Sequence, residues 1–187
     1  MRPTHEYRTA VARFLAWASV ALAALALAYF AATGGLREVV RSGPLAILFA
    51  TAMWVSFELP RVTVSDGGVT VRNVWRTIHV PWPTFRGLDS TWSLVLHTSE
   101  GDVASWAIPA TSGFAARASR DVAGQAGKGV NANSVALAIA ERHQQLIDAG
   151  HLGRRTLQEV HLERSWNRGA IGALALALLA AAASLPL

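Results

Sequence analysis

The sequence predicts an α+β membrane protein, in which a small antiparallel β-sandwich or barrel lies between an N-terminal transmembrane hairpin and a C-terminal transmembrane helix. Three observations lead to this fold class. Of the 187 residues, 52% are hydrophobic and only 16% are charged. The apolar residues form three long uncharged runs, two near the N-terminus and one at the C-terminus. Between them, residues 61–108 alternate between apolar and polar side chains and are broken by glycine and proline, as in short strands.

The first uncharged run, Phe14–Leu36, is predicted to be a transmembrane helix that follows a cytoplasmic tail of residues 1–13. Its 23 residues would span about 35 Å, which exceeds a hydrocarbon core of about 30 Å. Trp17 and Tyr29 near its ends suit the membrane interfaces. A cleaved signal peptide is the alternative, with residues 26–28 as a weak cleavage site. We favour a retained anchor, because the run exceeds a signal peptide's apolar region and a second run follows at once.

The second run, Ser42–Phe57, is predicted to be a second transmembrane helix, joined to the first by a connector at Arg37–Arg41. Its 16 residues would span only about 24 Å, so a buried or re-entrant helix is the alternative. Pro44 suits the first turn of a helix, where its missing N–H costs nothing. Trp54 near the other end suits the far interface.

The third run, residues 169–187, is predicted to be a third transmembrane helix, and a hydrophobic helix that packs on the first hairpin is the alternative. Small residues four positions apart let helices approach closely in lipid. The first and third runs each hold such a stripe, which indicates packing between spans or between protomers of a homo-oligomer, or only the abundance of alanine. The two stripes are Ala24, Ala28 and Ala32, and Ala173, Ala177 and Ala181.

The distribution of arginine predicts the orientation of the protein in the plasma (inner) membrane. With a cytoplasmic N-terminus, ten arginines near the spans lie inside and two, Arg37 and Arg41, lie outside. The positive-inside rule then places residues 58–168 in the cytoplasm and the C-terminus outside. The sequence therefore predicts a multi-pass protein with a cytoplasmic β domain.

The β domain is predicted to cover residues 58–120. Asp66-Gly67-Gly68 is a turn, because glycine adopts positive φ at little cost, and it joins a first hairpin. Pro81-Trp82-Pro83 interrupts the sheet, since proline donates no ladder hydrogen bond, and residues 84–88 follow as a connection. Five strands at this spacing are typical of a small sandwich or barrel. We expect them at 61–65, 69–72, 75–80, 92–98 and 103–108.

Beyond the strands, the pattern becomes helical. A short helix is expected at 111–119, then a glycine-rich linker at 121–133. Ser134 is a candidate N-cap for a helix that ends before Gly150. A further helix from Arg154 to Arg168 would run into the third span, so residues 134–168 are predicted to form a helical stalk.

The strand, glycine turn and strand of Val62–Arg72, followed by a strand that runs into Pro81-Trp82, resemble the start of a known domain. With Phe85, Leu94-Val95-Leu96 and Gly101, these residues resemble the bacterial pleckstrin-homology (PH)-like family, in the subset named for the low molecular weight protein antigen 6. The resemblance covers under a third of the chain. It implies a seven-stranded, partly open barrel closed by a C-terminal helix, here at 111–119 or 134–149, and it implies no enzyme.

Arginine is the residue type most suited to binding an anionic ligand here, because guanidinium groups bind phosphate bidentately. In eukaryotic PH domains, basic residues near the first hairpin hold phosphoinositide headgroups. Here Arg72 ends the second strand of that hairpin, and Arg76 lies in the strand that follows. Juxtamembrane arginines also gain from anionic lipids. Solvated strand arginines and simple topology determinants are the alternatives. The candidate anionic-lipid contacts are Arg72, Arg76, Arg154, Arg155, Arg164 and Arg168.

Four tryptophans in the strand region are expected to pack in the core or at its rim, and an exposed groove for a peptide or lipid is the alternative. They are Trp75, Trp82, Trp92 and Trp106. Cysteine is absent, which excludes thiol catalysis and iron–sulfur clusters. The histidines and serines lack metal-ligand or nucleophile spacing, and no phosphate loop is present. We therefore expect no enzyme, no metal and no cofactor.

These observations predict a non-catalytic, membrane-anchored module for protein interaction or scaffolding at the cytoplasmic face. Its partners would be membrane lipids and an unidentified protein, which a sheet edge could recruit by strand addition. An anionic-lipid-sensing or lipid-handling accessory is the alternative. Nucleic acid is not an expected partner, because residues 58–168 hold 12 basic and 10 acidic residues, too even a balance for nucleic-acid binding.

Overall fold

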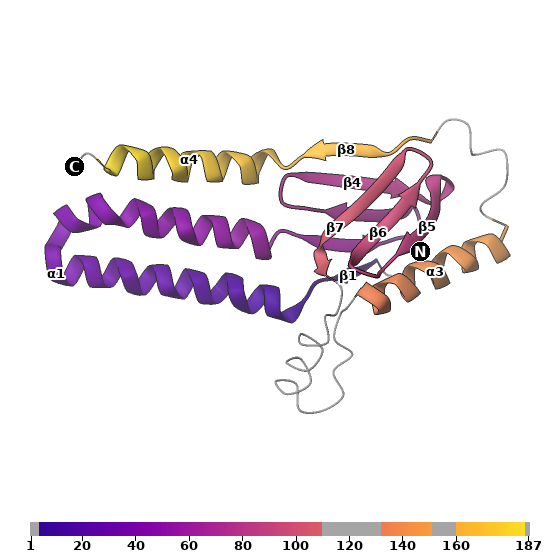
Figure 1. Cartoon of the computed structure of the whole chain (residues 1–187), viewed down its shortest axis with the longest axis horizontal. Helices are drawn as coiled ribbons and strands as arrows, with labels where there is room; N and C mark the ends of the chain where they lie inside the picture. The colour runs from indigo at the N-terminus through magenta and orange to yellow at the C-terminus, as the bar shows by residue number, and fades with distance from the viewer. Residues whose placement is uncertain (1–3, 110–131, 151–159, 186–187) are drawn as a thin grey trace, which may run out of the picture. The chain divides into compact units, whose positions relative to one another are not determined.

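A computed structural model describes residues 4–109, 132–150 and 160–185. The chain divides into two compact units (Figure 1). One is a β domain, formed by residues up to Ala10 and by Pro60–Ser165. The other is a helical unit, formed by Val11–Leu59 and the residues from Trp166 onward.

Helix α1 of the helical unit, Ala10–Phe57, is a hairpin of two helical arms that meet at Gly35. Gly35 has φ 62° and ψ −155°, a conformation that glycine adopts without the steric penalty of a side chain. The rings of Trp17 and Trp54 pack edge to face with centroids 5.1 Å apart. A Cβ atom on Gly43 would lie 3.1 Å from the side chain of Leu27. The two arms therefore run back along each other (Figure 1).

The hairpin itself was predicted, but the position of its turn was wrong. Residues 37–41 are helical and extend the second arm, and the chain reverses at Gly35 instead. Pro44 consequently lies inside the second arm and not in its first turn. Among the described residues, α1 is the one helix long and apolar enough to cross a membrane. Helix α4, Arg168–Ser184, is a shorter apolar helix of 17 residues.

The helical unit buries small side chains and exposes large ones. On α1 the buried residues include Ala16, Ser19 and Ala23, whereas Phe14 and Leu25 are about 70% exposed (71% and 68%). Helix α4 follows the same pattern, because its buried residues are alanines and a serine, while Leu176, Leu178 and Leu179 are exposed. The alanine stripe predicted on α1, at Ala24, Ala28 and Ala32, is exposed, so the close-packed face of α1 lies elsewhere. Of the stripe predicted on α4, Ala173 is exposed, whereas Ala177 and Ala181 are buried.

The described part of the β domain contains two β-sheets, built of antiparallel hairpins, and no closed barrel. The five-stranded sheet has the order β1-β2-β3-β4-β8 and the three-stranded sheet the order β5-β6-β7. A short 3-10 helix at Trp82–Thr84 joins them at the predicted proline break. The strands are β1 His5–Tyr7, β2 Arg61–Val64, β3 Gly68–Arg72, β4 Arg76–Pro81, β5 Phe85–Asp89, β6 Ser93–Thr98, β7 Gly101–Pro109 and β8 Glu163–Trp166.

Alternation along the strands builds one core between the sheets. Val62, Val71 and Val80 face inward from the five-stranded sheet, and Leu94 and Leu96 face inward from β6. Strand β7 lies against β2 and β3, which brings the two sheets together. Every one of these five side chains is fully buried (0% exposed), as expected for inward positions two residues apart.

Helix α3, Ala132–Asp148, completes this core and packs on β6. Its buried side chains follow helical spacing and include Val135, Ile139 and Leu146. The second of the two positions expected for the closing helix is therefore confirmed, and the first, at 111–119, lies outside the described residues.

Three strands were not predicted. His5–Tyr7 lies in the expected tail and pairs with β2, and Phe85–Asp89 forms β5 where a connection was expected. Glu163–Trp166 forms β8, which contradicts the helical stalk through residue 168. The physical reason is pairing partners far away in sequence, since Ser165 Oγ donates to the carbonyl of Thr77 (3.4 Å).

Candidate functional site

One end of the β domain brings together the places where the chain leaves for the apolar helices. Tyr7 faces Val62 across the β1–β2 ladder, so the chain leaves β1 toward α1 at that end. Strand β2 begins at Arg61 at the same end, and Ser165 of β8 bonds to Thr77 near the start of β4. We call this end, formed by Tyr7–Arg8, Arg61, Arg72–Arg76 and Ser165, the connecting end.

Three arginines cluster at the connecting end around one carboxylate. Arg61 lies opposite Arg72 in the β2–β3 hairpin. Arg8 forms an ion pair with Glu6, and Arg61 Nη1 lies 3.8 Å from the same carboxylate. Burial and the charges of Arg61 and Arg8 lower the pKa of Arg72, and Glu6 opposes them. Three arginines therefore lie around the Glu6 carboxylate, and such a concentration of guanidinium groups is suited to binding an anion.

Arg72 is the member of the cluster most suited to a ligand. Its Nε atom is buried and has no hydrogen-bond partner among the described residues. A buried donor without a partner is rare and costs free energy, because its hydration is lost without replacement. Because the Nε atom is closed to solvent, a phosphate oxygen would reach it only after the Arg72 side chain moves, and it would then satisfy the donor and add charge complementarity.

Two tryptophans flank this cluster and expose most of their surface. Trp75, in the β3–β4 turn, is 53% exposed, and Trp106 on β7 is 68% exposed. Asn73 holds both segments together, because its Oδ1 accepts from the Trp106 N–H (2.7 Å) and its Nδ2 donates to the Ala104 carbonyl (2.8 Å). Trp92, in the β5–β6 turn, is 87% exposed.

Core packing, the expectation for the four strand-region tryptophans, is confirmed only for Trp82. Its indole N–H donates to the Ser65 carbonyl (3.0 Å), and its ring stacks on His143 with centroids 5.7 Å apart. Phe85 contacts the same imidazole edge to face, at 4.9 Å. Burial in this aromatic cage lowers the pKa of His143.

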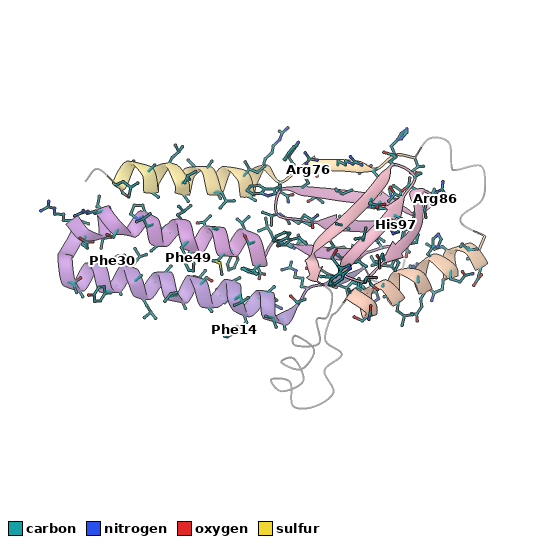
Figure 2. The ribbon with its side chains drawn as sticks, viewed as in Figure 1. Phe14, Phe30, Phe49, Arg76, Arg86 and His97 are labelled. Atoms are coloured by element: carbon teal, nitrogen blue, oxygen red, sulfur yellow. The ribbon has the colours of Figure 1, made fainter. Side chains whose placement is uncertain are left out.

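Four of the six predicted lipid-contact arginines lie in the described part of the chain. Arg72 and Arg76 share the connecting end. Arg86, which is not one of the six, is exposed toward the opposite end of the β domain (Figure 2). Arg164 donates to the Glu100 carbonyl at 3.5 Å, and Arg168 is the first residue of α4. Residues 154 and 155 lie outside the described part of the chain.

Two members of the cluster, Arg61 and Arg8, were absent from the predicted set. The hairpin centred on Gly67 already places Arg61 opposite Arg72, so the first of these was within reach of the sequence. Arg8 was not, because its position depends on β1.

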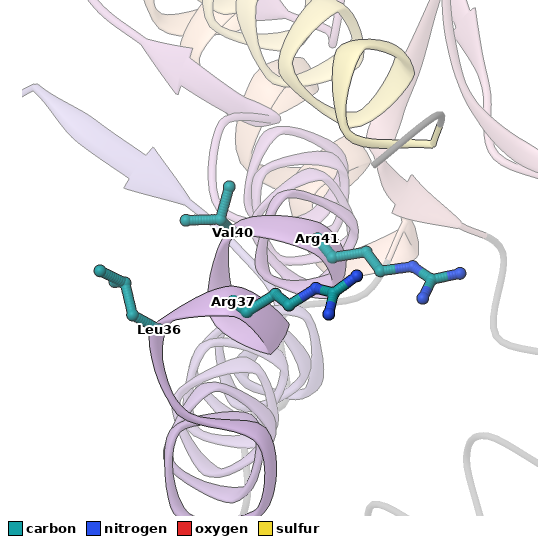
Figure 3. A pocket seen from close by; sticks show the side chains of 4 residues that line it. All are labelled: Leu36, Arg37, Val40 and Arg41. Atoms are coloured by element: carbon teal, nitrogen blue, oxygen red, sulfur yellow. The ribbon is translucent and has the colours of Figure 1, made fainter.

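Other polar groupings in the described residues do not form a second site. No group of three histidines, aspartates or glutamates is arranged to hold a metal ion. His97 pairs with Asp102 (2.8 Å) within the β6–β7 hairpin. On the second arm of α1, Leu36, Arg37, Val40 and Arg41 line a shallow hollow, from which both guanidinium groups extend outward (Figure 3). A single helix face lines it, so it lacks convergent groups.

Comparison with known proteins identifies the β domain. Residues 59–126 match the family model of the bacterial PH domain. No curated protein and no solved structure matches the chain. The match begins just before β2 and includes strands β2 to β7 of the two sheets. It therefore includes the β2–β3 hairpin, which carries Arg61 and Arg72. The chain therefore contains a bacterial PH-like domain.

Proposed function

We propose that the protein is a non-catalytic, membrane-anchored PH-like interaction module at the cytoplasmic face of the membrane, and that its β domain contacts anionic lipid headgroups. The arginine cluster of the connecting end carries this proposal. Arg8, Arg61 and Arg72 lie around the carboxylate of Glu6, and the buried Nε of Arg72 has no hydrogen-bond partner among the residues that the structure describes. Lipid phosphate is the ligand that fits this chemistry.

Membrane anchoring is supported by the distribution of side chains in the helical unit. Leucine and phenylalanine face outward and small residues are buried, the reverse of the pattern in a water-soluble helical bundle. The second arm of α1 from Leu36 onward has 22 residues and is about 33 Å long, and its uncharged part, Ser42–Phe57, is about 24 Å long. As a span, this arm would place Arg37 and Arg41 at the headgroups and would thin the bilayer locally. We propose that both arms and α4 are transmembrane, with the cytoplasmic orientation that the arginines favour.

The connecting end is joined to the apolar helices by short links. Two residues separate Tyr7 from α1, three separate Phe57 from β2, and one separates Trp166 from α4. Because an extended residue spans at most about 3.6 Å, these links keep the arginine cluster close to the headgroups. Each basic residue near an anionic surface gains about 1 kcal/mol.

Recruitment of a protein strand, the other hypothesis from the sequence, has less support. The outer edges of β2 and β4 are already occupied by β1 and β8 of the same chain. An extended partner would have to displace one of them or pair beyond these short strands.

The experiment uses the full chain in lipid nanodiscs that contain phosphatidylglycerol and phosphatidylcholine. Anionic lipid retained by the protein is measured by native mass spectrometry at two salt concentrations. We expect the Arg61→Gln/Arg72→Gln variant to lose most of the salt-sensitive retention. Arg86→Gln, which changes an exposed arginine toward the opposite end of the domain, is the matched control. Equal retention by all three proteins would remove the lipid assignment.

A further inference from the structure

Two indole rings lie exposed at the connecting end, although a tryptophan side chain gains much of its free energy from burial. Trp75 and Trp106 expose more than half of their surface, whereas Trp82 of the same domain is 2% exposed. Exposed apolar groups that lie together on a folded domain usually mark a surface that another molecule covers. The question is which molecule covers these two rings.

The two rings come from different sheets but are held as one surface. Trp75 belongs to the turn of the five-stranded sheet and Trp106 to the three-stranded sheet. The two hydrogen bonds of the Asn73 side chain fasten this turn to β7 directly beside Trp106. A surface fixed in this way is ready to dock without a large loss of conformational entropy.

The composition of the surface fits a lipid leaflet. Tryptophan prefers the membrane–water interface, where the ring lies among the upper acyl chains and the N–H stays hydrated. The arginine cluster of Arg8, Arg61 and Arg72 lies at the same end of the domain and complements anionic headgroups. A surface for binding another protein would not need the arginine cluster. It would also not need to lie at the end of the domain from which the links to the apolar helices leave.

We propose that Trp75 and Trp106 insert into the interfacial layer of the bilayer, so that the β domain docks edge-on upon the leaflet and is not displayed freely in the cytoplasm. This inference rests on the membrane anchoring of the proposed function and adds an apolar contact to the arginine contact. Trp92, which is 87% exposed, lies in the turn beside Ser93, and Ser93 pairs with Pro109 at the C-terminal end of β7.

The test labels the full chain with 5-fluorotryptophan in nanodiscs and records 19F spectra. Variants Trp75→Phe and Trp106→Phe assign the two signals, and the signal of buried Trp82 reports that the domain is folded. Spectra are recorded with lipid that carries a nitroxide at the headgroup and, separately, with a water-soluble gadolinium chelate. Each paramagnetic agent broadens the fluorine signals of the tryptophans that it approaches. We expect the Trp75 and Trp106 signals to be lost with the nitroxide lipid and retained with the chelate.

Loss of both signals with the chelate but not with the nitroxide lipid would overturn the proposal. Protection from both agents that appears only at high protein concentration would assign the surface to a second copy of the chain and would also overturn it. The measurement is repeated in purely zwitterionic nanodiscs. The nitroxide lipid could still remove the Trp75 and Trp106 signals in these nanodiscs, while the mass spectrometry experiment finds no retained anionic lipid. That result would support docking through the tryptophans and refute the arginine contact.

Discussion

Replacement of Ile139 by alanine tests whether α3 is an integral part of the β domain. Ile139 is fully buried (0% exposed) in the common core, on the helix face that packs on β6. The substitution removes three carbon groups, which are worth about 0.8 kcal/mol each in transfer free energy, or about 2.4 kcal/mol together. The cavity that remains raises the expected loss of stability to about 3–4 kcal/mol, within the usual range for such sites.

The matched control is Leu137→Ala on the same helix. Leu137 is 61% exposed, so its truncation should change the free energy of unfolding by no more than about 0.5 kcal/mol. Hydrogen exchange of the full chain measures both variants at the amides of β6 and β7. A loss of 3 kcal/mol corresponds to exchange about 100-fold faster, since each 1.4 kcal/mol is a factor of ten.

Equal exchange at β6 in the two variants would refute the reasoning. It would mean that the sheets are stable without α3, and that the helix is a peripheral addition to the PH-like core.

Three further outcomes are expected. Gly68→Ala should destabilise the domain by about 1–3 kcal/mol in thermal unfolding, because its Cβ would lie 2.3 Å from a carbonyl oxygen of the facing strand; Gly67→Ala, with nothing within 4 Å, should be nearly neutral. The lowered pKa of His143 favours its neutral form in the folded state, so stability should fall as the pH drops below about 6.5, and His143→Gln should flatten this dependence in melting curves. Glu100→Ala should speed amide exchange at Leu162, whose N–H the carboxylate accepts (3.1 Å), whereas Glu163→Ala should leave it unchanged.

The sequence predicts the strands that pair with their neighbours in the chain, and it misses those that do not. The β2–β3 hairpin and β4, β6 and β7 alternate clearly and are joined by short turns. Strand β1 has three residues and pairs His5 with Val64, almost sixty positions away, so no local pattern marks it. In β5 the ladder shifts register between Phe85 and Gly87, which interrupts the alternation.

The site was predictable only in part for the same reason. Arg72 was identified from its hairpin, but the cluster becomes visible only when β1 brings Arg8 and Glu6 to the same end. The exposure of Trp106 was likewise hidden, because alternation along β7 shows two faces without showing which one a second sheet covers. The bend of α1 depends on the backbone of Gly35, one of two adjacent glycines that composition alone does not distinguish.

The outer strands of the five-stranded sheet have a mechanical consequence. Strand β1 continues into α1 after two residues, and β8 continues into α4 after one, so each margin of one sheet is covalently joined to a different apolar helix. Both links leave from the connecting end, so a lateral force that separates these helices would act across the strands and pull the β1–β2 and β4–β8 pairs apart from that end. The hydrogen bonds of each pair would then be loaded one after another, so the short outer strands β1 and β8 would separate before the central strands of the sheet.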